Sequence, residues 1–228
     1  GSDGGNSHRY SLGVDWTSQW GGGQLRAHAY AVDYRLDLFS NFTYATDRDN
    51  GDQFEQFDGR RVYGGAASWN RALQWGSLEN DLAVGVELRR DDADTVGLYR
   101  TRARERIGTV REDAVVQSGY SAWSSVTTSW NDFVRTSIGL RADFFDFDVD
   151  SNLAINSGTA SDAIASPKLS LILGPWGDTE VFVNVGKGFH SNDARGTTIR
   201  VDPTDGATPA DRVDPLVGAV SADVGMRT

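Results

Sequence analysis

The chain has 228 residues, enough for one large all-β domain or two smaller ones. It contains no cysteine, which excludes zinc fingers, disulfide scaffolds and cysteine nucleophiles. Its net charge of −10 argues against a nucleic-acid partner, because such a protein needs a basic face. Nowhere do apolar residues approach a run of about 18, so the sequence predicts no transmembrane helix.

Four tight turns divide the chain, and each has a tryptophan beside it. Between the turns lie longer polar stretches, near 45–60, 90–112, 147–165 and 188–215. In an up-and-down β-barrel, short turns fall on one rim and long loops on the other. Tryptophan is enriched at membrane–water interfaces, where it forms an aromatic girdle. We therefore expect four tryptophans to mark the periplasmic rim: Trp20, Trp75, Trp130 and Trp176.

Alternation of apolar and polar residues predicts strands, because successive side chains point to opposite faces. In order along the chain, the expected strands lie near 8–20, 24–44, 60–74, 79–90, 112–130, 133–147, 166–174, 178–189 and 216–228. In the second of these, Tyr30, Val32 and Tyr34 alternate with charged residues. Arginine facing lipid at the bilayer midplane would cost about 2–4 kcal/mol. We therefore assign the charged parity to a lumen or a partner: Asp33, Arg35, Asp37, Arg135, Arg141 and Asp143.

These patterns predict an all-β fold, a partial antiparallel up-and-down transmembrane β-barrel. A soluble β-sandwich with a solvated outer face is the alternative, although strands of this length are rare in sandwiches. An odd number of strands is unusual for a bacterial barrel, whose termini normally share the periplasmic side. The chain carries no signal peptide and no aromatic last residue. We expect it to be an incomplete segment, 1–228, of a longer protein.

One region resembles a known family. Residues 166–176 read SPKLSLILGPW, and the next strand leads into GKGFHSNDARG at 186–196. Further matching stretches are 138–144, 201–203, 214–217 and 224–227, with 62–65 upstream. This pattern resembles the barrel of TonB-dependent outer-membrane receptors, in the branch that carries GFHSNDARG.

The resemblance implies about nine strands of a barrel of roughly 22 strands, closed by an N-terminal plug that this chain lacks along with the C-terminal strands. It implies active uptake of a scarce nutrient: a ferric siderophore, or alternatively a vitamin or a saccharide. The implied partners are the TonB–ExbB–ExbD system through the missing plug, outer-membrane lipid and lipopolysaccharide, and the small-molecule nutrient. The implied location is the bacterial outer membrane, and no cofactor is expected. A passive porin and a soluble all-β binding domain remain the rival functions.

Polar and aromatic residues leave a strand at the expected lumen mouth. They could contact a ligand, since polar groups at a pocket mouth fix ligand orientation, or they could fix the strand-to-loop turn by hydrogen bonds. These are Phe189, His190, Asn192, Asp193 and Arg195. Arg102 and Arg104 belong to an alternating stripe with Arg100 and Arg106. The stripe could attract an anionic siderophore or lipopolysaccharide phosphates, or it could pair with nearby acidic residues.

Asp146, Asp148 and Asp150 resemble the start of a calcium loop, but the required glycine and acid are replaced by Ser151 and Ser157. A simpler interpretation turns these aspartates inward after a β-bulge, with Phe145, Phe147 and Val149 outward. We therefore expect no metal site. The three histidines lack metal-ligand spacing and no nucleophile motif is present, so the sequence does not indicate an enzyme.

Overall fold

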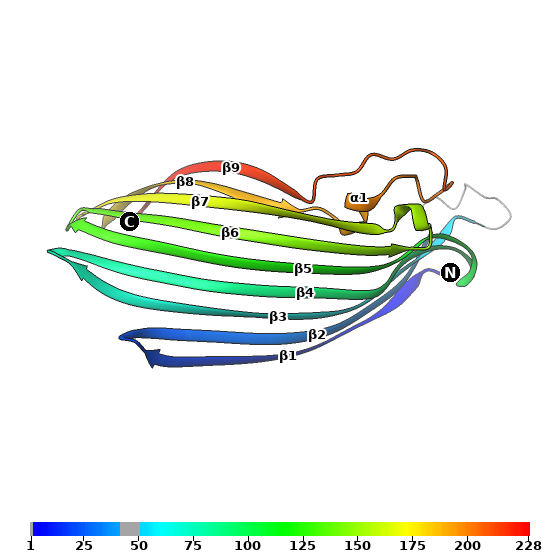
Figure 1. Ribbon diagram of the computed structural model, residues 1–228, viewed down its shortest axis with the longest axis horizontal. Helices are drawn as coiled ribbons and strands as arrows, with labels where there is room; N and C mark the ends of the chain where they lie inside the picture. Colours follow the sequence, from blue (N-terminus) through cyan, green and yellow to red (C-terminus); the bar gives the residue numbers. More distant parts are fainter. Residues whose placement is uncertain (1, 42–50) are drawn as a thin grey trace.

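The computed structural model describes residues 2–41 and 51–228. Over these residues the chain forms one antiparallel sheet of nine strands in chain order, β1 to β9 (Figure 1). The all-β, up-and-down fold and the nine strands expected from the sequence are confirmed. The strands are β1 (Gly4–Trp20), β2 (Gly23–Asn41), β3 (Gln53–Trp75), β4 (Leu78–Arg102), β5 (Glu105–Asn131), β6 (Val134–Ser151), β7 (Gly158–Trp176), β8 (Thr179–Ser191) and β9 (Leu216–Arg227).

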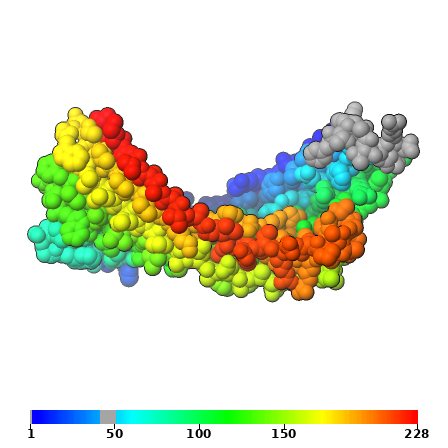
Figure 2. Space-filling view, turned by 90° about the horizontal axis from the view of Figure 1, so that it is seen from above, coloured from blue at the N-terminus to red at the C-terminus, as the bar shows by residue number. Residues whose placement is uncertain are grey.

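The sheet is curved rather than flat, with its two ends rising on the same side (Figure 2). It does not close on itself, because β1 pairs only with β2 and β9 only with β8. The four tight turns beside tryptophan all lie at one end, on the left of Figure 1. Gly21 and Gly22 have φ of 60° and 74°, a conformation that suits the twist of a two-residue hairpin and that glycine adopts without strain.

One face of the sheet is apolar and exposed. Leu12 is 73% exposed, and the strands across the sheet carry similar side chains. The register aligns Leu88 with Tyr120 and Tyr120 with Phe144, and residues directly opposite each other share a face. The same face includes Val84, Val86, Ile138, Leu140, Leu169, Val220, Val224 and Met226. An apolar band of this extent is typical of a wall that faces lipid. We call it the outer face.

The register corrects the assignment of three charged residues in β2. Asp33 lies opposite Tyr10, and Ala31 lies opposite Leu12, so their parity belongs to the outer face. The predicted lumen orientation is therefore wrong for Asp33, Arg35 and Asp37. Within the apolar band the outer side of β2 is alanine, which gives a weak hydrophobic signal: Ala27, Ala29 and Ala31. The larger Tyr30, Val32 and Tyr34 point inward and misled the parity assignment.

These charged residues lie beyond the apolar band, where Asp33 and Arg35 contact other side chains. Asp33 accepts a hydrogen bond from His8 at 3.3 Å and lies 3.8 Å from the Arg61 guanidinium. The guanidinium of Arg35 stacks 4.8 Å from the centre of the Phe57 ring. Their charges therefore avoid the cost of a lipid-facing position at the midplane.

The stretches expected to be long loops are largely strand. Strands β4 and β5 continue to a two-residue turn at Ala103 and Arg104, so 90–112 is an extended hairpin. Most of 147–165 belongs to β6 and β7, which join through a short 3₁₀ turn, η1 (Ala154–Asn156). Residues 53–60 belong to β3, whereas 42–50 lie outside the described residues. Because the side chains beyond the apolar band are charged, the sequence predicts loops there. The hydrogen-bonded pairing of the strands nevertheless continues through these residues.

The connection between β8 and β9 does remain long, and it folds onto the inner face. Its helix α1 (Ala194–Thr198) places Ala194 against Phe147 and Val149, which are 0% and 1% exposed. This small core explains a second correction. Phe147 and Val149 point inward, while Asp146, Asp148 and Asp150 are exposed on the outer parity, since β6 keeps an unbroken register through them. The expected β-bulge after Phe144 is therefore wrong.

Candidate functional site

Arginine and aspartate two residues apart recur on the inner side of the molecule. Residues at this spacing on a strand point to the same side, so each arginine can bond its own strand's carboxylate. The Arg89 guanidinium donates two hydrogen bonds to Asp91, at 2.6 and 2.8 Å. We call such pairs the inner couples: on strands, Asp58–Arg60, Arg89–Asp91, Arg111–Asp113 and Arg141–Asp143, and at the start of α1, Asp193–Arg195. Each couple compensates its charge within its own segment.

In most inner couples the carboxylate side chain is less exposed to solvent than the arginine side chain. The Asp143 side chain is 1% exposed and that of Arg141 is 32% exposed, and Asp91 and Arg89 differ in the same direction. Arginine has five N–H donors, so bidentate pairing leaves some for other partners. The inner wall therefore offers hydrogen-bond donors without a large excess of positive charge.

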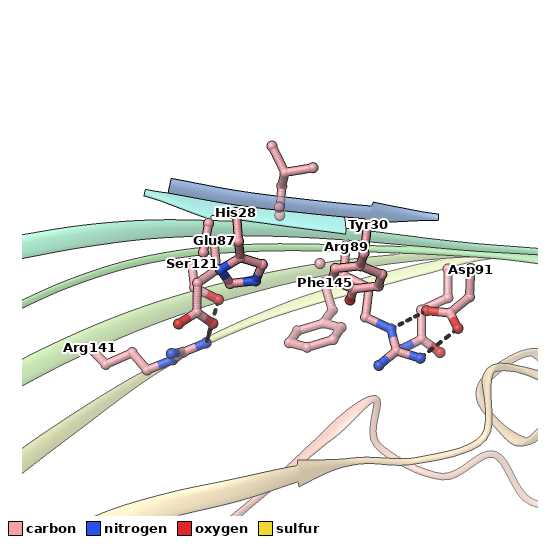
Figure 3. Close-up of a pocket in the computed structure, with 13 residues that line it drawn as sticks. His28, Tyr30, Glu87, Arg89, Asp91, Ser121, Arg141 and Phe145 are labelled. Atoms are coloured by element: carbon pink, nitrogen blue, oxygen red, sulfur yellow. Dashed lines mark hydrogen bonds and ion pairs between the residues drawn. The ribbon is translucent and has the colours of Figure 1, made fainter. Parts of the chain in front are cut away.

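The inner face has a hollow of about 390 Å³, lined by residues of β2 to β6 (Figure 3). His28, Tyr30 and Phe145 contribute rings on the same side as the charged groups. Here Arg141 reaches Glu87 on β4 at 2.9 Å and Ser121 on β5 at 2.8 Å. The network joins three strands and is satisfied within the wall.

A second hollow of about 500 Å³ lies further toward the long-connection end. One side is formed by Arg60, Arg89 and Asp91 from β3 and β4. The other side is formed by residues 191–195, where β8 passes into α1. Phe145 contributes an aromatic surface, and the Phe189 ring packs edge-on against it at 5.9 Å. The hollow therefore combines guanidinium donors, carboxylates and a ring.

The residues that begin α1 are tied to one another. Asp193 caps the helix by accepting from the backbone N–H of Arg195 at 2.9 Å, and the Arg195 side chain returns to the same carboxylate at 2.6 Å. Burial raises the pKa of Asp193, but the hydrogen bonds and charge of Arg195 outweigh it and hold that pKa below the usual range. Asn192 donates from its side chain to the Asp214 carbonyl at 2.8 Å. These contacts fix the turn, which was one of the two roles expected from the sequence.

Another polar cluster lies at the tip of the β4–β5 hairpin. Arg106 donates two hydrogen bonds to the buried Glu55 and stacks 3.6 Å from the centre of the Tyr99 ring. Burial and a 2.6 Å hydrogen bond to Glu112 raise the pKa of Tyr99 to about 12. Burial and the Glu55 charge raise the pKa of Asp37. The cluster holds the tip against β2 and β3.

The predicted ligand-contact residues separate into two places. Asn192, Asp193 and Arg195 line the second hollow, whereas His190 is exposed and lies opposite Val217 in the β8–β9 ladder. Arg104 instead bonds the backbone carbonyls of Ser2 and Asp3, at 2.7 and 3.0 Å, and Arg102 lies opposite Glu105 beside the turn. The structure therefore does not bring the arginine stripe and the α1 residues into one site.

The remaining residues are those that the sequence assigns to the lumen or to the membrane interface, and the three aspartates that resemble the start of a calcium loop. Arg135 and Arg141 lie on the inner parity, where Arg135 bonds Glu180 at 2.5 Å. The four tryptophans of the tight turns are all at least half exposed at the same end of the sheet. Asp146, Asp148 and Asp150 do not gather, and the described residues hold no group of three or more acidic or histidine side chains that could bind a metal ion.

Sequence reasoning missed the residues of β3 and β4 that form the hollows. Arg60, Arg89 and Asp91 lie at or next to the strand ends expected near 60 and 90, whereas Glu87 lies within the expected strand. A usable signal was present in the repeated arginine–x–aspartate spacing at 89–91, 111–113 and 141–143.

An exposed apolar outer face and a charged inner face on an open, curved antiparallel sheet define part of the wall of a membrane β-barrel. The model of the family "TonB dependent receptor-like, beta-barrel" matches residues 1–216. The chain therefore belongs to the TonB-dependent receptor β-barrel family. Among the described residues, helices are all too short or too polar to cross a membrane. No curated protein sequence matches the chain.

Solved structures share the fold at low identity. The copper transporter OprC superimposes with a TM-score of 0.71 at 17% identity, over 99% of this chain and 36% of OprC. BauA, the ferric preacinetobactin receptor from Acinetobacter baumannii, gives 0.72 at 12% identity, over 96% of this chain and 35% of its own. The ferric citrate transporter FecA gives 0.69 at 10% identity, over 80% and 27%. The chain thus spans roughly a third of these transporters and receptors.

Proposed function

We propose that this chain is the barrel segment of an outer-membrane receptor that imports a scarce nutrient by TonB-dependent transport, with a ferric siderophore as the cargo. Membership of the receptor family carries this proposal. Two of the structural neighbours are described as a ferric preacinetobactin receptor and a ferric citrate transporter, which favours an iron chelate over a vitamin or a saccharide.

In this proposal the rest of the receptor supplies the remaining strands and a plug, and the plug meets the TonB–ExbB–ExbD system. The apolar outer face contacts lipid, and the exposed tryptophans lie at the periplasmic interface. The charged residues beyond the apolar band, including Asp33 and Arg61, then lie at the level of lipopolysaccharide headgroups.

The inner couples refine the expected contact with the plug. Arg141 and Asp143 are already paired with each other and with Glu87 and Ser121. A plug would therefore meet this wall through hydrogen bonds to the remaining guanidinium N–H groups rather than through new salt bridges.

Growth under iron limitation tests the proposal. The complete gene that carries this chain should restore growth on a ferric hydroxamate or a ferric catecholate in a strain lacking its own receptors. Restoration should disappear when tonB is deleted, because active uptake requires the energy relay. Uptake that persists without TonB would favour the passive porin.

A second measurement distinguishes the membrane barrel from the alternative of a soluble all-β binding domain. The complete protein should fractionate with outer membranes and show heat-modifiable migration in detergent. Recovery of the complete protein as a soluble monomer without detergent would contradict the membrane-barrel function.

A further inference from the structure

The β8–β9 connection is fixed on the inner side at two places. At the second place, the fully buried Asn156 donates to the Val201 carbonyl at 3.0 Å and accepts from the backbone N–H groups of Arg200 and Val201. At the first place, Arg195 contacts Asp113 and Arg111 of β5. We call residues 192–198 the inner segment.

Asp113 is the centre of this first contact. Its side chain is 0% exposed, it accepts a hydrogen bond from Arg111 on its own strand, and it lies 3.9 Å from the Arg195 guanidinium. Arg111 also reaches the Arg195 carbonyl at 3.4 Å. The second oxygen of Asp113, Oδ1, has no hydrogen-bond partner among the described residues. One buried carboxylate therefore lies between two guanidinium groups that come from different parts of the chain.

The charges explain what this carboxylate does. Without it, Arg111 and Arg195 would face each other across a poorly hydrated contact, where like charges repel strongly. Among the residues that the structure describes, the other ion-pair partner of Arg195 is Asp193, which belongs to the same segment and cannot attach it to the wall.

We propose that Asp113 is a positioning residue that holds the inner segment inside the lumen, so that Asn192, Asp193 and Arg195 form one side of the second hollow. Arg60, Arg89 and Asp91 form the opposite side. The role in ligand binding rests on the proposed function. The hollow fits a chelate whose surface displays carbonyl or hydroxyl oxygens, because the couples leave N–H donors with little net charge.

Hydrogen exchange on the complete receptor in detergent tests the anchoring. Asp113→Asn removes the charge between the guanidinium groups and keeps the side-chain shape. We expect the amides of residues 194–201 to exchange about tenfold faster or more, because local opening there becomes easier. Unchanged exchange in this segment would overturn the proposal.

Asp143→Asn is the matched control. Asp143 is another covered carboxylate paired with an arginine two residues earlier, but its partners are Arg141 and Ser121. It should leave exchange at 194–201 unchanged, and equal acceleration in both variants would contradict a specific role of Asp113. If Asp113→Asn fails to fold, Arg195→Ala removes the other half of the contact and should give the same local acceleration.

Ligand binding tests whether the anchoring by Asp113 matters for function. For whichever of ferric hydroxamate and ferric catecholate the wild type binds, Asp113→Asn should raise Kd about tenfold and leave uptake at saturating ligand unchanged, as expected for loss of uniform binding. An unchanged Kd would overturn the positioning role. If the wild type binds neither chelate, the siderophore proposal fails, while the exchange measurement still decides whether Asp113 anchors the segment.

Discussion

At the scale of single residues, local charge pairing explains how a membrane wall tolerates so many ionised groups. Arg141 and Asp143 share one face of β6, and the carboxylate is almost completely covered. A covered carboxylate is stable only with donors close to it, and here Arg141 and Ser121 supply them. The inner couples therefore stabilise the wall as well as forming part of its inner surface.

Asp143→Asn should lower the free energy of unfolding by about 1–3 kcal/mol, because it leaves the donors of Arg141 and Ser121 poorly matched. The double variant Arg141→Gln/Asp143→Asn should lose less than the sum of the two single variants. Denaturant titration of the complete receptor in detergent measures both effects. Additive losses would show that the two side chains are not coupled.

Tyr99 should ionise at a higher pH than an unperturbed tyrosine, since its pKa is raised to about 12. Because this folded-state pKa exceeds the unfolded value of about 10, its hydrogen bond contributes stability below pH 10, which is lost as the pH rises toward 12. Absorbance titration at alkaline pH should lose a transition near pH 12 in Tyr99→Phe. Loss of a transition near pH 10 instead would contradict the buried, bonded phenol.

At the scale of elements, the β4–β5 hairpin shows how far the strands extend beyond the membrane. Its two-residue turn has φ of 50° at Ala103 and 70° at Arg104, which are strained values for residues with a side chain. The backbone N–H of Arg104 donates to Gln53 at 2.9 Å, and the Arg106–Glu55 pair holds the tip. Tertiary contacts thus maintain a turn that local preference disfavours.

Ala103→Asn should raise the free energy of local opening of this tip by about 0.5–1 kcal/mol, because asparagine tolerates positive φ and is favoured in such turns. Hydrogen exchange of residues 99–106 measures it. The control Ala83→Asn lies in ordinary strand backbone of β4 and should not slow exchange there. Faster exchange in Ala103→Asn would contradict the strained-turn interpretation.

At the scale of the whole molecule, the two faces of the sheet should differ in how well they tolerate a charged substitution. Val86→Arg places a charge in the apolar band and should cost about 2–4 kcal/mol. Ala66→Arg, on the neighbouring strand and the inner face, should cost less because it points toward polar groups. Folding yield and denaturant midpoint of the complete receptor in lipid bilayers compare them. Equal losses would contradict the assignment of the faces.

The sequence by itself determined the strand count, the four tight turns beside tryptophan and the family. These follow from local alternation, from glycine beside tryptophan, and from the 166–196 motif. It did not determine the face of β2, because small alanines mark the lipid side there while Tyr30 and Tyr34 point inward.

Only the tertiary structure decided which charges meet. Arg195 and Asp113 are far apart in sequence, and Phe147, which points inward by the unbroken register of β6, is buried in contact with Ala194. A side chain's parity is a local property, but its partner depends on the register and on where a long connection folds. Both are settled by burial and charge compensation across the whole sheet.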